Sequence, residues 1–335
     1  KFDRKGAIPL EKALTVALVG NPNCGKTSLF NDLTGSNQYV GNWPGVTVEK
    51  KVGKTTDGSF ELVDLPGIYS LSPYTMEEIV TRDFIIDDHP DAVINIIDGT
   101  NIERNLYLTL QLIELDVPMV VAVNMFDAVE AKGEHINCEK LSELIGVSFI
   151  PISAKTGFNI DRILDEAKKV GYAGTKPQKP LQYNSATINA ANEIALILSD
   201  VAEGSRLFFY SIKLLEGDTQ VPKRLKLDKN HKDKIERVVR NYESRSQYGD
   251  RETMVADARY SYIEKIVSQT VEKPDLVKDL SVSEKIDRVV PNRFLAIPIF
   301  FVVIFLMFAI TFGPVGESLK GCVEWLFDDV VTPFV

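Results

Sequence analysis

The stretch that most restricts the fold of this chain begins at Leu14 and reads LTVALVGNPNCGKTSLFNDL. A short apolar run, typical of a buried strand, leads into the loop GNPNCGKT, and apolar residues at helical spacing follow it. The order strand, G-x-x-x-x-G-K-[ST] loop, helix is the signature of a phosphate-binding loop. The first expectation is therefore an α/β domain built around such a loop.

Each fixed position of this loop has a chemical task. Gly20 and Gly25 let backbone N–H groups close around a β-phosphate. Lys26 adds a cation at the β- and γ-phosphates, and Thr27 offers its hydroxyl to Mg²⁺, the expected cofactor. The residues predicted to bind nucleotide here are Gly20, Asn21, Pro22, Asn23, Cys24, Gly25, Lys26, Thr27 and Ser28.

Three further segments follow in the order expected of a nucleotide-binding domain. ELVDLPG ends a strand at Asp64, which can hold Mg²⁺ through water, and leaves the N–H of Gly67 to meet a γ-phosphate. VPMVVAVNMFD and FIPISAKTG are two more strand-like runs with polar ends. Strands that alternate with helices predict a doubly wound sheet with its ligand at the carboxyl ends of the strands. The predicted binding residues there are Asp64, Leu65, Pro66, Gly67, Asn124, Met125, Asp127, Ser153, Ala154 and Lys155.

The choice of base rests on Asp127. Its carboxylate can accept hydrogen bonds from both N1–H and the 2-amino group of guanine. Adenine presents no such pair of donors, and it would leave the carboxylate charge unpaired. Guanine is therefore favoured. The alternative is that Asp127 only caps the helix that follows its strand.

Beyond about Gly171 the pattern changes from strands to helices. GYAGTKPQKP reads as a linker, and ATINAANEIALILSDVAE and RETMVADARYSYIEKIVSQTVE carry apolar residues at three- and four-residue spacings. The expected organisation is a tail over residues 1–13, a nucleotide-binding domain over 14–172 and a small all-α domain over 173–275. The charge-rich run KRLKLDKNHKDKIERVVRNYESR is most simply a solvated helix face, with a partner site as the alternative.

The overall charge argues against nucleic acid as a partner. The net charge is -9 and the pI is near 5.1, whereas sequence-independent binding to RNA or DNA depends on clustered Lys and Arg. The cysteines Cys24, Cys138 and Cys322 lie far apart and form no CxxC pair. Neither a disulfide framework nor a zinc site is expected, and a reducing compartment fits.

The last part of the chain is strongly apolar. No residue from Phe294 to Gly316 is charged. At about 1.5 Å per residue, such a segment can cross a hydrocarbon core about 30 Å thick. A transmembrane helix over residues 294–316 is therefore predicted, with a buried helix of a soluble domain as the alternative.

The flanks of this segment predict its orientation. Lys285, Arg288 and Arg293 precede it and acidic residues follow it, which places residues 1–293 in the cytoplasm. Residues 276–293 are expected to form a juxtamembrane helix. Because one helix cannot form a pathway, we expect residues 317–335 to begin a membrane domain that continues beyond this chain.

In combination these motifs resemble the small G-protein superfamily. The details GNPNCGKTSLFN, NWPGVTVE, DLPGIYSLSPYTMEE, NMFD and SAKTG are closely similar to the G domain of the FeoB family, the prokaryotic ferrous iron transport proteins B. The resemblance covers essentially the whole chain, because that family follows its G domain with a helical domain and a membrane domain. It implies that Thr47 is the switch threonine that closes on Mg²⁺ and the γ-phosphate. It therefore adds to the binding set Gly45, Val46, Thr47, Val48 and Glu49.

This resemblance also implies a function. We expect a slow GTPase that binds GTP and GDP in the bacterial inner (plasma) membrane, and whose nucleotide state gates or drives import of Fe²⁺. We also expect small accessory proteins of the same transport system and a homo-oligomer. Cys322 is a candidate soft ligand for Fe²⁺, with a small apolar residue as its alternative role. A membrane-tethered signalling GTPase without a transport role is the alternative function.

Hydrolysis requires a group that organises the attacking water. Ile68 stands after Gly67, where Ras-like enzymes carry a glutamine, and it cannot hydrogen-bond a water. Asn23 resembles the asparagine that ligates K⁺ beside the β- and γ-phosphates in a related group of G proteins. K⁺ would neutralise charge there as an arginine finger does. Hydrolysis is therefore expected to be K⁺-stimulated, unless Asn23 merely caps the loop, and the predicted catalytic residues are Asn23, Lys26, Thr47 and Gly67.

Met125 departs from the superfamily pattern, because the usual NKxD motif has a lysine at this position. The family tolerates the change, and a methionine side chain can still pack flat against a base.

Overall fold

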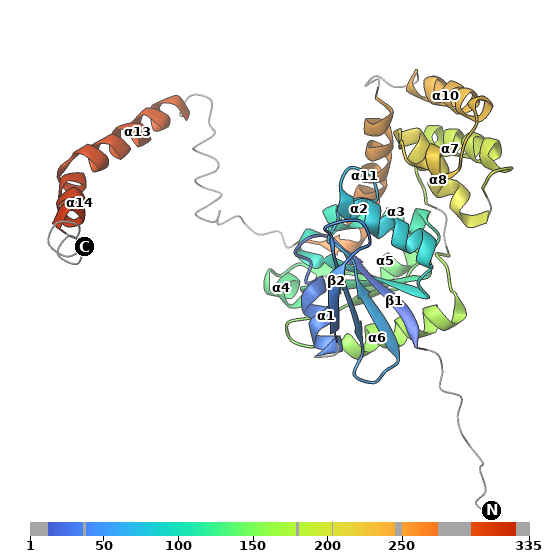
Figure 1. Cartoon of the computed structure of the whole chain (residues 1–335), viewed down its shortest axis with the longest axis horizontal. Helices are drawn as coiled ribbons and strands as arrows, with labels where there is room; N and C mark the ends of the chain where they lie inside the picture. The colour runs from blue at the N-terminus through green and yellow to red at the C-terminus, as the bar shows by residue number, and fades with distance from the viewer. Residues whose placement is uncertain are drawn as a thin grey trace, which may run out of the picture. The chain divides into compact units, whose positions relative to one another are not determined.

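The computed structural model describes residues 13–35, 38–178, 181–202, 204–244, 250–273 and 296–325 (Figure 1). The chain divides into two compact units, Lys1–Pro274 and Asp275–Val335. The expected juxtamembrane helix over residues 276–293, and all but the last residue of the expected tail, lie outside the described residues.

The first unit is built on a seven-stranded sheet in the order β2-β3-β4-β1-β5-β6-β8. The strands from β4 to β8 in this order run parallel, whereas β3 is antiparallel to both β2 and β4. The predicted doubly wound α/β domain is confirmed, and a hairpin extends it at one edge. The strands are β1 (Leu14–Gly20), β2 (Gln38–Asn42), β3 (Glu49–Lys54), β4 (Phe60–Asp64), β5 (Ala92–Asp98), β6 (Met119–Asn124) and β8 (Phe149–Pro151).

Helices cover both faces of the sheet. They are α1 (Lys26–Thr34), α2 (Met76–Asp83), the π-helix η1 (Phe84–Asp88), the 3-10 turn η2 (Gly99–Asn101), α3 (Ile102–Glu114), α4 (Phe126–Ala131), α5 (Cys138–Ile145) and α6 (Ile160–Ala173). Successive residues of a strand point to opposite faces. Val16 and Leu18 of β1 therefore pack in one core with α1 and α6, whereas Ala17 and Val19 pack in another that includes α3.

A helical region follows the sheet domain within the same unit. α7 packs against α8 and α10, and α11 packs against α8 (Figure 1). α11 also contacts α3 and α5 of the sheet domain, and the short strand after it, β9, pairs with β7. The elements are β7 (His135–Ile136), α7 (Ser185–Leu198), the 3-10 turn η3 (Gly204–Arg206), α8 (Leu207–Glu216), α9 (Val221–Arg224), α10 (Lys229–Glu243), α11 (Arg251–Thr270) and β9 (Val271–Glu272).

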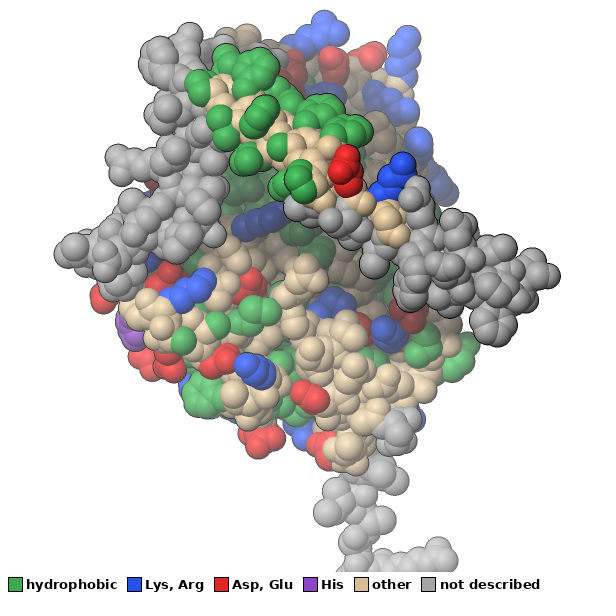
Figure 2. All heavy atoms as spheres, turned by 90° about the vertical axis from the view of Figure 1, so that its left-hand side faces the viewer, with side chains coloured by type: hydrophobic (Ala, Val, Ile, Leu, Met, Phe, Trp, Pro, Cys, Tyr) green, Lys and Arg blue, Asp and Glu red, His purple; other side chains and the backbone are tan. Residues whose placement is uncertain are grey.

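In the second unit the structure describes two helices, α13 (Ala296–Phe312) and α14 (Pro314–Trp325). They divide the single helix expected over residues 294–316, because Pro314 has no N–H and disfavours a helical conformation in the residue before it. Apolar side chains gather on the visible face of α13 (Figure 2). Among the residues of this helix, Phe305 is 72% exposed. Among the described residues, none of the helices combines the length and the apolarity needed to cross a membrane.

Candidate nucleotide-binding site

The phosphate loop joins β1 to α1 at the carboxyl edge of the sheet. Gly25 has a φ of 88°, in the left-handed region, and a Cβ there would lie 2.2 Å from Nδ2 of Asn124. At Gly20 a Cβ would lie 2.3 Å from the carbonyl oxygen of Ile96. Only glycine fits at either position, so the loop backbone can lie close against its neighbours.

A cation, a hydroxyl and a carboxylate converge where β1 and β4 end. The Lys26 ammonium forms an ion pair with the Asp64 carboxylate, and Thr27 Oγ1 lies 3.5 Å from Asp64 Oδ2. Lys26 and Asp64 are buried, and Thr27 is exposed. Hydroxyl and carboxylate oxygens are ligands that Mg²⁺ prefers, and an ammonium beside them suits a phosphate. The donor set therefore fits a Mg²⁺–phosphate group.

Asn124, at the end of β6, holds two loops of the site together. Its Nδ2 donates to the carbonyl oxygen of Cys24 at 2.8 Å, and the N–H of Ala154 donates to its Oδ1 at 2.9 Å. Both contacts are buried. The motifs NMFD and SAKTG are thereby fixed against the phosphate loop, a role that the sequence alone did not assign to Asn124.

A cavity of about 550 Å³ opens beside the phosphate loop. The segment of residues 65–75 after β4, here the post-β4 segment, lies against this loop. The N–H of Ile68 donates to the carbonyl oxygen of Gly20 at 3.1 Å, and Gly67 lies close to Pro22. The lining residues are Asn21, Pro22, Asn23, Gly25, Lys26, Thr27, Ser28, Gly67 and Met125.

The residues predicted to read the base lie after β6 and β8. Met125, with a φ of 60°, is the N-cap of α4, and Asp127 stands exposed in the first turn of that helix. Asp127 therefore does not cap α4, which removes the alternative role considered for it. Ser153 and Ala154 are buried and Lys155 is exposed.

Two other predicted site residues contribute to packing. Leu65 is fully buried and belongs to the hydrophobic core. Cys24 is also buried, and burial raises the pKa of its thiol to about 11, so the thiol is protonated at neutral pH.

The structure does not bring the switch threonine to the cavity. Thr47 is exposed in the loop between β2 and β3, which is closed by a 2.9 Å hydrogen bond from the Trp43 N–H to the Val48 carbonyl oxygen. The stretch Gly45 to Glu49 is not among the lining residues. The role of Thr47 at Mg²⁺ and the γ-phosphate stays a prediction.

Glu78 and Gln111, which the sequence did not single out as site residues, hold the post-β4 segment in place through hydrogen bonds. Thr75 and Glu78 form a capping box at the start of α2, and Ser70 Oγ donates to Glu78 Oε1 at 3.0 Å. Gln111 of α3 accepts the Leu71 N–H at 2.5 Å. The T-x-x-E spacing could have revealed the first contact, whereas a glutamine within a helix carries no such signal.

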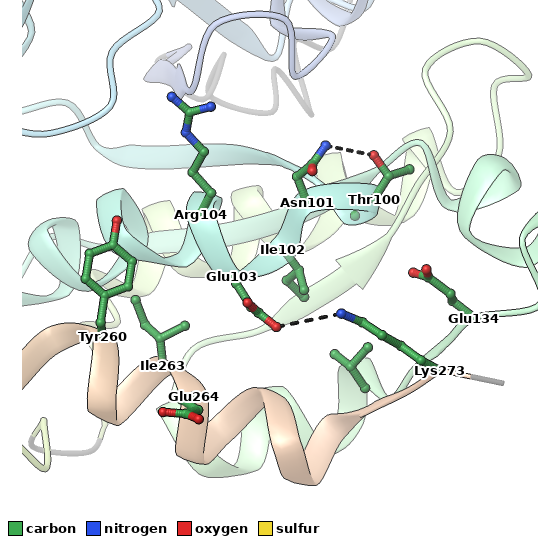
Figure 3. A pocket seen from close by; sticks show the side chains of 12 residues that line it. Thr100, Asn101, Ile102, Glu103, Arg104, Glu134, Tyr260, Ile263, Glu264 and Lys273 are labelled. Carbon is green, nitrogen blue, oxygen red and sulfur yellow. Dashed lines mark hydrogen bonds and ion pairs between the residues drawn. The ribbon is translucent and has the colours of Figure 1, made fainter. Parts of the chain in front are cut away.

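A second cavity, of about 530 Å³, is lined from one side by η2 and the start of α3 and from the other by α11 and β9 (Figure 3). Glu103 and Lys273 form an ion pair across it at 3.8 Å (Figure 3). Arg104, which also lines it, places its guanidinium 4.3 Å from the ring centre of Tyr69 in the post-β4 segment. This cavity therefore adjoins both the helical region and the segment that contacts the phosphate loop.

Comparison with known proteins agrees with these features. Two family models match, Ferrous iron transport protein B over residues 14–167 and FeoB cytosolic helical domain over residues 183–272. A GDP-bound mutant of the S. thermophilus FeoB G-domain is 39% identical with a TM-score of 0.74, and the match covers 77% of this chain and 100% of that chain. The chain belongs to the FeoB family.

Other FeoB proteins match to a similar extent. S. thermophilus NFeoB bound to GDP·AlF4⁻ and K⁺ is 40% identical with a TM-score of 0.70, over 76% of this chain and 99% of that one. The Fe(2+) transporter FeoB of Escherichia coli K12 is 37% identical over 95% of this chain and 40% of its own length. A Porphyromonas gingivalis Fe(2+) transport protein A/Fe(2+) transporter FeoB fusion protein is 36% identical over 91% of this chain and 37% of its own length. The chain thus spans 37% to 40% of the length of these curated relatives.

Proposed function

We propose that this chain is the GTP-binding and GTP-hydrolysing part of a ferrous iron transporter. The observation that carries the proposal is the convergence of Lys26, Thr27 and Asp64 at the end of β1 and β4, beside a cavity large enough for phosphates. The iron substrate is supported by the relatives named Fe(2+) transporter FeoB. The guanine nucleotide is supported by the relatives solved with GDP.

The residues have distinct parts in this proposal. Lys26 binds the β- and γ-phosphates, and the N–H groups of the loop close around the β-phosphate. Thr27 and Asp64 would hold Mg²⁺, which would supply positive charge to neutralise the phosphates. Gly67 would offer its N–H to the γ-phosphate, and Thr47 would add a hydroxyl to the residues that hold Mg²⁺. The remaining predicted binding residues shape the loops that carry these groups.

Base recognition is tested at Asp127. Asp127→Asn replaces one acceptor oxygen with a donor, which suits xanthine, a base with an oxygen in place of the 2-amino group. GDP affinity should fall about a hundredfold or more, because one hydrogen bond to guanine is lost and the other is no longer charge-assisted, and affinity for xanthosine diphosphate should rise. Titration with fluorescent forms of both nucleotides measures this. Equal losses for both nucleotides would show that Asp127 does not read the base.

We propose that K⁺ stimulates hydrolysis through Asn23. This residue lines the cavity, is exposed and has a φ of 65°, and no side-chain hydrogen bond caps α1. A carboxamide oxygen there suits a monovalent cation, and the relative solved with K⁺ supports this. Hydrolysis should be faster in K⁺ than in Na⁺, and Asn23→Ala should remove that difference while GDP affinity is kept. K⁺ stimulation that persists in Asn23→Ala would refute this hypothesis.

The transport role belongs to a longer protein that carries this chain. We propose that it lies in the bacterial plasma membrane with residues 1–293 in the cytoplasm, and that the apolar segment around α13 enters the membrane. We also propose Cys322, in α14, as a candidate Fe²⁺ ligand. The fusion relative supports a small accessory protein as a partner, and a homo-oligomer is also proposed.

Transport is tested by uptake of labelled Fe²⁺ in cells that lack their own ferrous importer. The cells would express the full-length protein with native Asp127 or with Asp127→Asn. Uptake that collapses in the variant would tie guanine recognition to iron import. If neither protein moves iron, the membrane-tethered signalling switch is the better account.

A further inference from the structure

Asn21, the second residue of the phosphate loop, is buried although the polar atoms of its side chain form no hydrogen bonds. It is 3% exposed, and within the described part of the chain neither Nδ2 nor Oδ1 has a hydrogen-bond partner. A carboxamide carries two donor hydrogens and an acceptor oxygen. Burying these groups unpaired is unfavourable, and native proteins rarely do so. A state in which Asn21 gains partners is therefore stabilised relative to this one.

The contrast with Asn124 shows that burial alone does not explain this. Both asparagines are 3% exposed and both belong to the nucleotide-binding site. Asn124 uses both ends of its carboxamide to join two loops, at 2.8 Å and 2.9 Å, whereas Asn21 uses neither. A fixed, purely structural carboxamide is expected to pair at least one end, as Asn124 does with both ends and Asn95 of β5 does with one.

The position of Asn21 indicates where its partners come from. Its neighbour Gly20 accepts the N–H of Ile68 at 3.1 Å, and at Gly67 a Cβ would lie 3.1 Å from the Cα of its other neighbour, Pro22. The backbone of the post-β4 segment thus lies against the loop on both sides of Asn21. Asn21 and Gly67 both line the 550 Å³ cavity, so a nucleotide bound there would lie beside both the carboxamide and that backbone.

We propose that Asn21 is a positioning residue for the GTP-bound state. When the N–H of Gly67 turns to the γ-phosphate, the backbone of Gly67 and Ile68 shifts, and its polar groups hydrogen-bond the Asn21 carboxamide. Asn21 then holds the post-β4 segment in place for hydrolysis, which Ile68 cannot do with its apolar side chain. The inference rests on the proposed function, because it requires that this cavity bind GTP.

The test compares two nucleotides rather than one. Asn21→Leu keeps a similar volume and removes every hydrogen-bonding atom. Its affinity for a non-hydrolysable GTP analogue should fall about fivefold to tenfold further than its affinity for GDP, as expected for the loss of about one hydrogen bond that is made only with GTP bound. The melting temperature without nucleotide should hold or rise, because an unsatisfied buried group is gone.

Two further variants keep the result interpretable. Asn21→Thr, which retains one hydroxyl, should fold even if leucine does not fit, and should lose less of the preference for the GTP analogue. Asn241→Leu makes the same chemical change at an exposed site on α10 and should leave both affinities unchanged. Affinities would be measured by calorimetry with Mg²⁺ and K⁺ present.

The outcomes separate the two proposals. Native protein that binds neither nucleotide would refute the proposed function itself. Native protein that binds both, with an unaltered affinity ratio in the Asn21 variants, would overturn the inference alone. A parallel loss of both affinities would do the same, since it would show that Asn21 merely supports the loop.

Discussion

Two clusters of buried charge in the first unit differ in how completely they are paired. In the site cluster, Lys26 and Asp64 pair beside the open cavity, with Thr27 as their neighbour. In the interface cluster, Arg259 of α11 pairs with Glu114 of α3 through two hydrogen bonds, at 2.8 Å and 3.0 Å. Glu114 also lines a cavity, of about 670 Å³, but its carboxylate is already fully paired with Arg259.

The interface cluster extends through several polar groups. Burial opposes ionisation of Glu216, but the charges of Arg259 and Lys213 outweigh it, so its pKa is lowered. Lys213 donates to Glu216 at 2.9 Å and lies 3.3 Å from Ser72 of the post-β4 segment. The cluster also includes the hydroxyls of Tyr107 and Tyr183.

This difference separates a structural cluster from a functional one. The interface charges satisfy one another and hold the helical region against α3, so removal of one member leaves the others buried and unpaired. The site charges lie where a phosphate and a cation can replace their mutual contact. We therefore expect the interface cluster to dominate stability and the site cluster to dominate activity.

The largest effect should come from Arg259→Met. It leaves Glu114 and part of Glu216 without their cation, and the free energy of unfolding should fall by about 3–5 kcal/mol. Urea unfolding followed by circular dichroism measures this change. Lys265→Met, on the exposed face of the same helix, is the matched control and should cost at most about 0.5 kcal/mol. Equal stability of the two variants would show that the interface cluster is not structural.

The site cluster is tested with Lys26→Met. GTP hydrolysis should fall about a hundredfold or more, as when a preorganised donor to a developing charge is lost, and GDP should no longer raise the melting temperature. The free energy of unfolding should change less than in Arg259→Met, because water in the cavity can solvate Asp64. A stability loss as large as that of Arg259→Met would contradict the distinction between a structural interface cluster and a functional site cluster.

Replacing Asn124, a buried amide within the site, should have an effect on both stability and nucleotide binding. Asn124→Ala leaves the Cys24 carbonyl and the Ala154 N–H unpaired, so the free energy of unfolding should fall by about 1–3 kcal/mol and GDP affinity should fall with it. Asn95→Ala is the matched control, since Asn95 is fully buried in β5 and bonded to Thr109 at 2.7 Å. The control should lose stability but keep GDP affinity. If both variants bind GDP like the native protein, Asn124 does not hold the site together.

The sequence was sufficient for the parts of the site that depend on short motifs. The phosphate loop, Asp64 and Asn124 each stand at the carboxyl end of a buried strand, so alternation of strand and helix placed them at one edge of the sheet. The sequence also predicted that the residue after Gly67, Ile68, cannot hydrogen-bond a water. Their hydrogen-bond partners could not be read in the same way, because Asn124 reaches Cys24 across 100 residues.

Features that depend on distant contacts were not predictable. Glu114 and Arg259 lie 145 residues apart and each looks like an ordinary helix charge. The exposed position of Thr47 depends on how its loop closes between β2 and β3, which no local pattern specifies. The end of α13 at Phe312 was predictable in principle from Gly313 and Pro314, but apolarity alone extended the expected helix past them.

The smallest effect is expected from a third cluster, at the surface of the helical region. His231 lies 3.1 Å through Nε2 from Asp200 and 2.7 Å through Nδ1 from Asp228. Hydrogen bonding to Asp200, and then to Asp228, raises the pKa of His231 above its usual value near 6.5. Since the folded pKa is raised, the stabilisation is complete below the unfolded pKa and is lost as pH rises through the folded one.

The corresponding test compares the melting temperature of the native protein with that of His231→Gln between about pH 5 and about pH 9. The difference should be largest at the acidic end and should vanish at the alkaline end. Because both aspartates are exposed, it should stay smaller than the loss in Arg259→Met at every pH. A difference that is constant with pH would mean that His231 stabilises by packing rather than by its charge. Charge pairing would then stabilise the buried interface cluster but not the surface cluster around His231.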